Sequence, residues 1–275
     1  MKLRLAIVAS LISLLLVAPG AAQAAAADLP YESLPRFTNN PVGERAQPIS
    51  FIYVGTEAEV SQAFYSAGWL GADPATPSNL LRAYRAAKAD APYPTAPFSP
   101  AFIGTNKHDL AFQMATSNNT IHERHHTRLW DSGAVTNDGR PIWVGTASYD
   151  DDIATLGRTR IPVHSIDPNI DEERQFIVGS LGLPVEYVQI VEPQSGKNAL
   201  GDDWYTDGVA AVIEVPALSG RQTTYAAPAS SGQSATISSY TPASSTTSYS
   251  SGALDRFSAW LERTADRAGL PSNLF

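Results

Sequence analysis

The chain has 275 residues, of which 43% are hydrophobic and 17% charged, so it can bury a sizeable core in one or two domains. It has no cysteine, which excludes disulfides, thiolate metal sites and lipidation through an N-terminal cysteine. The net charge is −8, and an acidic protein is a poor ligand for nucleic acids and anionic lipids. We therefore expect no nucleic-acid partner, and any small anionic ligand would need a local basic cluster.

The N-terminus has the three parts of a secretory signal peptide. A basic stretch, Met1–Arg4, precedes the apolar run Leu5–Val17, and Ala22-Gln23-Ala24 fits the small-x-small rule of signal peptidase. The apolar run is short for a membrane span. We predict that residues 1–24 are a signal peptide and that the mature protein is exported to the periplasm or the extracellular space. Loss of Lys2 and Arg4 would take the net charge from −8 to −10.

The next segments predict the start of a folded domain. Residues 25–48 are rich in Ala, Pro and Asn and are expected to form an irregular arm. A strand is predicted at Ile49–Val54. Thr56 and Glu59 have the spacing of a capping box, so a helix should begin there and end near Gly68. Later elements are expected as a helix at Asn79–Ala89 and strands at Ala101–Gly104 and Leu110–Met114.

Two strands, Ile121–Trp130 and Pro141–Tyr149, are predicted to pair as an antiparallel hairpin through the turn at Asn137–Arg140. Successive side chains of a strand point to opposite faces. One face of the first strand should therefore carry Arg124, His126, Arg128 and Trp130, and the other His125, Thr127 and Leu129. On the second strand, Trp143, Gly145, Ala147 and Tyr149 should share a face.

A helix is predicted to follow, with Asp167 as its N-cap, Pro168 in its first turn and Gly182 at its end. Strands are expected at Glu186–Glu192 and Val209–Val215, the second nearly all apolar and therefore central. The predicted fold class is α+β, a single domain over residues 49–216 with a mainly antiparallel sheet and helices packed on one face.

The C-terminal region changes composition. Residues 217–251 are rich in Ser, Thr and Ala with almost no charge, which is typical of a flexible linker. Residues 252–275 are predicted to form a short amphipathic helix whose apolar stripe contains Leu254, Phe257, Trp260 and Leu261. This helix could fold back onto the domain or dock to a membrane or secretion partner.

The stretch Arg124-His125-His126-Thr127-Arg128-Leu129-Trp130 resembles the Arg-His-His-x-Arg-Leu-Trp signature of the LssY C-terminal domain. Further segments resemble the family in the same order, over about Ile49 to Val215: Ala67–Trp69, Asp109–Gln113, Trp143–Asp150, His164–Arg174 and Thr206–Gly208. The resemblance implies a bacterial domain often attached to multi-span membrane proteins similar to DedA or lipid-phosphatase modules, named after a type I secretion cluster, with no settled activity.

This chain departs from the family pattern in two ways. It carries the domain alone behind a predicted signal peptide. It also has Val163-His164-Ser165 where the family commonly has Thr-His, often with a second histidine, so a two-imidazole site there would be one ligand short.

Three interpretations of the basic and acidic residues stay open. In a hydrolase, Arg124 and Arg128 would grip an anion, with His126, His164 and Asp150 as catalytic groups; Trp130, Trp143 and Arg174 complete the expected ligand-binding set. In a metal site, His125 or His126, together with His164 and carboxylates from Asp150, Asp167 or Asp171, would hold a divalent ion such as zinc. In a structural network, Arg128 and Arg174 would pair with Asp150, Asp167 and Asp171 and fix the hairpin against the helix.

Two functions from different classes follow. The first is an envelope hydrolase acting on a small phosphorylated or polar compound. The alternative is a non-catalytic periplasmic binding or accessory module associated with membrane or secretion components. A metal site, or a His164–carboxylate contact in a cleft, would favour the enzyme, whereas closed, fully paired Arg128 and Arg174 would favour the module.

Overall fold

The computed structural model describes residues 29–40, 42–97, 99–116, 122–156, 161–198 and 201–218. The predicted signal peptide, nearly all of the predicted linker and the predicted C-terminal helix lie outside these residues. Within them, strands predominate and are accompanied by three α-helices. The fold is α+β with a mainly antiparallel sheet, as predicted.

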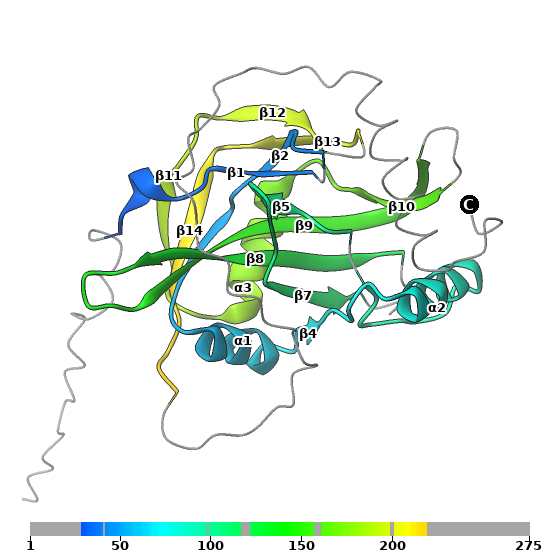
Figure 1. The fold of residues 1–275 in the computed structure, drawn as a ribbon, viewed down its shortest axis with the longest axis horizontal. Helices are drawn as coiled ribbons and strands as arrows, with labels where there is room; N and C mark the ends of the chain where they lie inside the picture. Colours follow the sequence, from blue (N-terminus) through cyan, green and yellow to red (C-terminus); the bar gives the residue numbers. More distant parts are fainter. Residues whose placement is uncertain are drawn as a thin grey trace, which may run out of the picture.

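A large eight-stranded sheet forms the centre of the molecule (Figure 1). Its strand order is β11-β14-β3-β9-β8-β7-β4, and β10 pairs with β9 outside this path. Only the β14–β3 pair is parallel. The strands are β3 (Phe51–Val54), β4 (Leu70–Gly71), β7 (Leu110–Ala115), β8 (Arg124–Val135), β9 (Pro141–Leu156), β10 (Ile161–Ile166), β11 (Glu186–Gln189) and β14 (Val209–Glu214). The apolar strand β14 is interior, as its composition predicted.

The long hairpin β8–β9 confirms the predicted pairing. Gly139, with a φ of 85°, closes the turn, and the backbone N–H of Thr136 donates to the carbonyl oxygen of Arg140 at 2.9 Å. Arg124 lies opposite Asp150, and His126 lies opposite Ser148. This register decides which polar side chains meet.

One face of the sheet is covered by α1 (Glu57–Ser66) and α3 (Ile170–Leu181). The predicted capping box is present: Thr56 Oγ1 accepts from Glu59 N at 3.3 Å, and Glu59 Oε2 accepts from Thr56 N at 2.8 Å. Val60 and Phe64 of α1 and Ile177 of α3 belong to one core cluster with strand residues that include Phe51, Tyr53, Leu129, Trp143 and Ala147. Trp69, 1% exposed, is part of this core, as expected.

The opposite face is covered by a second, four-stranded sheet, of order β2-β1-β5-β6 (Figure 1). Its strands are β1 (Phe37–Asn39), β2 (Arg45–Pro48), β5 (Phe102–Ile103) and β6 (Asn106–Lys107). Leu29 and Leu34 pack here against Ile52, Trp130 and Val144. The irregular arm expected at residues 25–48 is therefore wrong for its described part, which includes a 3₁₀ helix (Tyr31–Ser33) and two strands. Its few apolar residues are too widely spaced to show strand periodicity, although β1 and β2 pair as a short antiparallel hairpin.

The third helix, α2 (Pro77–Lys88), lies toward the end of the large sheet far from the β8–β9 turn (Figure 1). Its alanines pack against Tyr93 and Ala96 in a separate small cluster. The expectation that the helices pack on one face is thus not confirmed for α2. A short hairpin of β12 (Gln194–Lys197) and β13 (Asp203–Thr206) completes the described fold.

Candidate functional site

The buried carboxylate of Asp150, on β9, is the centre of a polar cluster on the face that the second sheet covers. Arg124 Nε lies 2.7 Å from Oδ2 and His126 Nε2 lies 2.8 Å from Oδ1. His164, on β10, places Nδ1 3.3 Å from Oδ2. The three residues expected to be catalytic are therefore brought together, and Arg124 joins them. We call these four residues the Asp150 cluster.

The Asp150 cluster is enclosed by neighbouring segments. Arg124 also donates to the carbonyl oxygen of Ala96 at 3.2 Å and to Gln113 Oε1 at 3.1 Å. Ser148, the cross-strand neighbour of His126, donates to Oε1 of Gln47 on β2 at 3.1 Å. Strand β2, which the sequence did not predict, thus contacts this end of the site.

Burial and charge pairing determine the protonation states in the cluster. Burial raises the pKa of Asp150, but His126, His164 and Arg124 lower it more strongly, so the pKa lies well below its ordinary value. Burial lowers the pKa of His126 and of His164 to about 4, against the opposing attraction of Asp150. At neutral pH both imidazoles are therefore neutral, and the hydrogen-bond geometry makes His126 Nε2–H the donor to Asp150.

A second polar pair lies on the opposite, helix-covered face. His125 Nδ1 is 2.8 Å from Oε2 of Glu173 on α3. The His125 ring stacks on Phe176 at a centroid distance of 3.6 Å and lies 4.8 Å from the Tyr149 ring. Burial, with Asp150 and Asp167, raises the pKa of Glu173 to about 10, and burial lowers that of His125 to about 4. Glu173 is therefore protonated at neutral pH, and its O–H donates to His125.

Sequence reasoning missed Glu173. Its side chain is 4% exposed, and its Oε1 has no hydrogen-bond partner among the described residues. The available signal was its position: Glu173 lies between Ile170 and Ile177 on the buried side of an amphipathic helix, where a carboxylate is unexpected.

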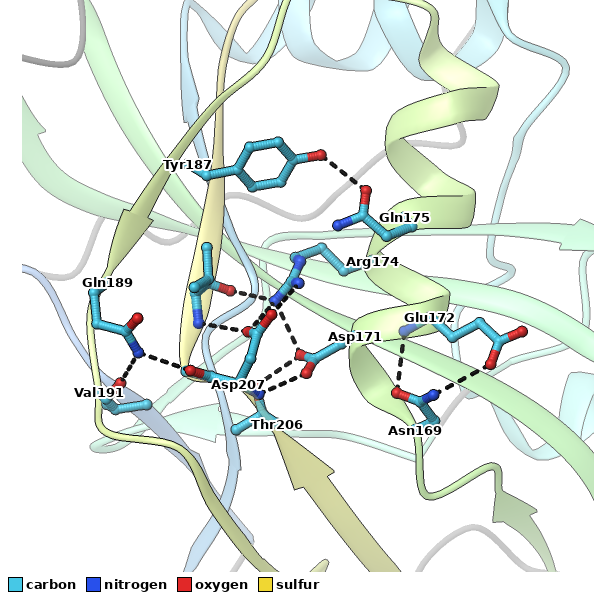
Figure 2. A network of polar contacts seen from close by, with 12 residues as sticks. Asn169, Asp171, Glu172, Arg174, Gln175, Tyr187, Gln189, Val191, Thr206 and Asp207 are labelled. Carbon is cyan, nitrogen blue, oxygen red and sulfur yellow. Dashed lines mark hydrogen bonds and ion pairs between the residues drawn. The ribbon is translucent and has the colours of Figure 1, made fainter.

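A third network joins α3 to the turn between β13 and β14 (Figure 2). Arg174, 3% exposed, contacts Asp171 at 2.9 Å and grips both oxygens of Asp207 at 2.8 and 2.9 Å. It also donates to the carbonyl oxygen of Val209 at 2.5 Å. Asp171 in turn accepts from Thr206 Oγ1 at 2.7 Å and from Asp207 N at 2.6 Å. We call this network the Arg174 clasp. It occupies Arg174 and Asp171 with structural contacts.

The start of α3 differs from the prediction. Asn169 is the N-cap, and its Oδ1 accepts from Glu172 N at 3.3 Å (Figure 2). Asp167 instead accepts from the backbone N–H of Asn169 at 2.7 Å. Asp167 thus forms a local turn two residues before the N-cap, and Pro168 lies outside the helix. Asp and Asn are equally good caps, so composition could not choose between them.

Of the residues expected as metal ligands, His126, His164 and Asp150 meet in the Asp150 cluster, whereas the others lie in separate contacts. His125 pairs with Glu173, Asp167 holds the turn before α3, and Asp171 belongs to the Arg174 clasp. In the part of the chain that the structure describes, no group of three or more histidine, aspartate or glutamate side chains is arranged to hold a metal ion. The divalent-metal interpretation is therefore not supported by this geometry.

The remaining expected ligand-binding residues are divided between the two faces. Trp130 is 2% exposed and donates to the carbonyl oxygen of Asn106 at 3.2 Å. Trp143 is 4% exposed on the helix-covered face and donates to the carbonyl oxygen of Gly55 at 3.0 Å. Both indoles are core residues. Arg128 donates to the carbonyl oxygen of Ser99 at 3.2 Å. Arg124, rather than Arg128, is the direct partner of Asp150.

The fold and the site define an α+β domain in which a histidine- and arginine-rich hairpin makes a buried polar core. The family described as LssY C-terminus matches residues 31–209, and the chain belongs to this family. The matched region begins before the predicted boundary at residue 49 and includes β1 and β2. No curated protein and no solved structure gives a significant match to the chain. Among the described helices, none has the length and apolar character needed to cross a membrane.

Proposed function

We propose that the chain is an exported, non-catalytic binding or accessory module of the cell envelope, in which the Asp150 cluster is a structural polar core. The main support for this proposal is that the Asp150 cluster is buried and paired internally. Arg124, His126 and Asp150 are each at most 4% exposed, and Arg124 and His126 occupy both carboxylate oxygens. A buried carboxylate with a hydrogen-bond partner on each oxygen specifies one arrangement of strands.

The protonation states support the same function. A general base works best when its pKa lies near the working pH. The pKa values of His126 and His164 are lowered to about 4 by burial, so both are weak bases at neutral pH. Arg174 is likewise committed to Asp171 and Asp207 and is 3% exposed. Closed pairing of this arginine is the feature expected of a module rather than an enzyme.

An envelope hydrolase acting on a small phosphorylated or polar compound is the second candidate. The meeting of His126, His164 and Asp150 favours it, since an imidazole oriented by a carboxylate is a common arrangement for proton transfer. His164 is the most exposed of the three, with a side chain 20% exposed.

A hydrolysis assay separates the two functions. Mature protein, residues 25–275, is tested on p-nitrophenyl phosphate and bis-p-nitrophenyl phosphate, with and without zinc, beside His164→Gln and Asp150→Asn. We expect no turnover above that of Asp150→Asn, no stoichiometric metal, and lower unfolding temperatures for both variants. Turnover by the wild type that is lost in a fully folded His164→Gln variant would overturn the proposal.

Export is tested separately by expressing the full chain and fractionating the cells. Cleavage after Ala24 should give a mature protein beginning at Ala25 outside the cytoplasm, because residues 1–24 carry the three regions of a signal peptide. A chain that stays in the cytoplasm with its N-terminus intact would refute export.

The accessory role also gives residues 252–275 a partner, since their predicted apolar stripe suits contact with a membrane or a secretion component. Deletion of these residues should release the protein from the membrane fraction. Equal fractionation of the full and shortened chains would refute this contact.

A further inference from the structure

Three basic residues gather where the second sheet crosses the large one. Arg128 lies on β8, Lys107 ends β6 and His108 follows it. We call these three residues the basic cluster. Arg128 points to the same face as Arg124 but lies four residues farther along the strand, about 13 Å away. Arg128 is therefore not one of the residues that hydrogen-bond to Asp150, although the two charges still interact.

Contacts of the Trp130 side chain and of the β5–β6 backbone place Lys107 and His108 near Arg128. Trp130, two residues after Arg128 and on the same face, donates to the carbonyl oxygen of Asn106, which precedes Lys107. The His108 ring meets the Trp130 ring edge-on at a centroid distance of 6.2 Å. The backbone N–H of His108 donates to Ala101 at 3.2 Å. The hairpin β5–β6 is thus fixed over β8 with Lys107 and His108 beside Arg128.

The cluster concentrates positive charge in an acidic protein. Burial and then Arg128 lower the pKa of Lys107, and burial, Arg128 and Lys107 lower that of His108 well below its ordinary value. The acid that acts on Arg128 is Asp150, which Arg124 and His126 already hold.

Two groups of the cluster lack internal partners. Lys107 forms no ion pair with any residue that the structure describes, and it is exposed. His108 Nδ1 is buried, and within the described residues it has no hydrogen-bond partner. Buried polar atoms are nearly always hydrogen-bonded in folded proteins, so an unsatisfied nitrogen beside two cations indicates a ligand.

We propose that Lys107, His108 and Arg128 bind the phosphate group of an anionic ligand. Two permanent cations match the charge of a phosphate monoester, and the guanidinium, ammonium and imidazole groups provide donors from different directions. The net charge of −8 disfavours contact of this domain with an anionic membrane, which favours a small soluble phosphate compound over a lipid headgroup. This proposal rests on the proposed function in one respect: the phosphate compound is bound and not hydrolysed.

The test uses the mature protein at low salt, with glycerol phosphate and inorganic phosphate as probes and calorimetry and histidine NMR as readouts. Lys107→Gln is the decisive variant because Lys107 is exposed and can change without loss of fold. Lys197→Gln is the matched control, an exposed lysine that pairs with Asp203 elsewhere. Arg128→Met is a further variant that also alters the interior. Vesicles of phosphatidylcholine with and without phosphatidylglycerol distinguish a lipid source.

We expect saturable binding of glycerol phosphate, weakened about tenfold in Lys107→Gln and unchanged in Lys197→Gln. The ring signals of His108 should shift on binding, and its pKa should rise because the anion offsets the neighbouring cations. If the protein binds only the phosphatidylglycerol vesicles, and Lys107→Gln abolishes that binding, the basic cluster still binds phosphate but the ligand is a lipid headgroup. Absence of saturable binding to any probe, or equal weakening in both lysine variants, would overturn the proposal. Hydrolysis of p-nitrophenyl phosphate would instead refute the non-catalytic function and leave this binding result intact.

Discussion

Replacing Glu173 with glutamine tests whether a carboxyl group is buried in its neutral form. The side chain is 4% exposed, its Oε1 lacks a partner among the described residues, and its Oε2 contacts His125. Burial, Asp150 and Asp167 raise its pKa to about 10. Glutamine resembles the protonated carboxyl group and has no proton to take up on folding.

The sign of the pH dependence follows from this shift. In the unfolded chain Glu173 loses its proton above a pH of about 4.3, whereas in the folded chain it keeps the proton up to about 10. The stability of the wild type should therefore fall between these values, by about 1.4 kcal/mol per pH unit at most, or about 5 kcal/mol by pH 8. In the glutamine variant, the second N–H of the side-chain amide would cost about 1–3 kcal/mol because it is buried without a partner.

Glu173→Gln should therefore be more stable than the wild type by about 2–4 kcal/mol at pH 8 and slightly less stable at pH 5. Chemical denaturation at a series of pH values measures the pH at which the stabilities of the variant and the wild type become equal. Glu172→Gln is the control, since Glu172 is exposed on the same helix and should change stability by less than about 1 kcal/mol at every pH. A variant that is destabilised more at pH 8 than at pH 5 would refute the reasoning and show an ionised Glu173 paired with a charged His125.

Three further predictions concern the polar networks. Arg174→Met should lower the free energy of unfolding by about 3 kcal/mol, because it leaves Asp171 and Asp207 without their shared cation. Equal denaturation midpoints for the wild type and this variant would contradict the Arg174 clasp. Gly208→Ala should cost more than about 2 kcal/mol in the same assay, since φ is +79° and a Cβ would lie 2.0 Å from the carbonyl oxygen of Val191; a neutral result would exclude this backbone geometry. Asp150→Asn should cost about 3 kcal/mol near neutral pH. The pKa of Asp150 is depressed in the folded chain, so its contribution is present above about pH 4 and is lost as the pH falls toward the folded value. The gap between wild type and variant should accordingly narrow in acid, and a constant gap would argue against an ionised Asp150.

The residues that mark the family divide between the two faces of the hairpin. Arg124 and His126 support Asp150 on the face covered by the second sheet, and His125 meets Glu173 of α3 on the other. The Thr206–Gly208 segment supplies the Arg174 clasp (Figure 2). These signature residues therefore tie α3, β10 and the β13–β14 turn to one hairpin, which is the arrangement expected of a structural core.

The sequence by itself determined the elements whose signals are local. The capping box of Thr56 and Glu59, the left-handed Gly182 that ends α3 and the turn at Asn137–Arg140 depend on hydrogen bonds and backbone angles within a few residues. Strand alternation also assigned Arg124, His126 and Arg128 to one face, because its period of two needs no knowledge of a partner strand.

Only the tertiary structure decided which of those side chains meet. Arg124 and Arg128 share a face, so alternation cannot choose between them. The register can, and it places Arg124 opposite Asp150 and Arg128 opposite Thr146. The pairing of β8 with β9 shifts in register between Asp131 and Val135, so these opposite pairs cannot be counted out from the length of the turn. Glu173 was missed because its contact with His125 joins residues far apart in the chain, and burial, which shifts its pKa, is a property of the assembled layers. Strand β2 was missed because its few apolar residues show no strand periodicity, although its partner β1 is close in the chain.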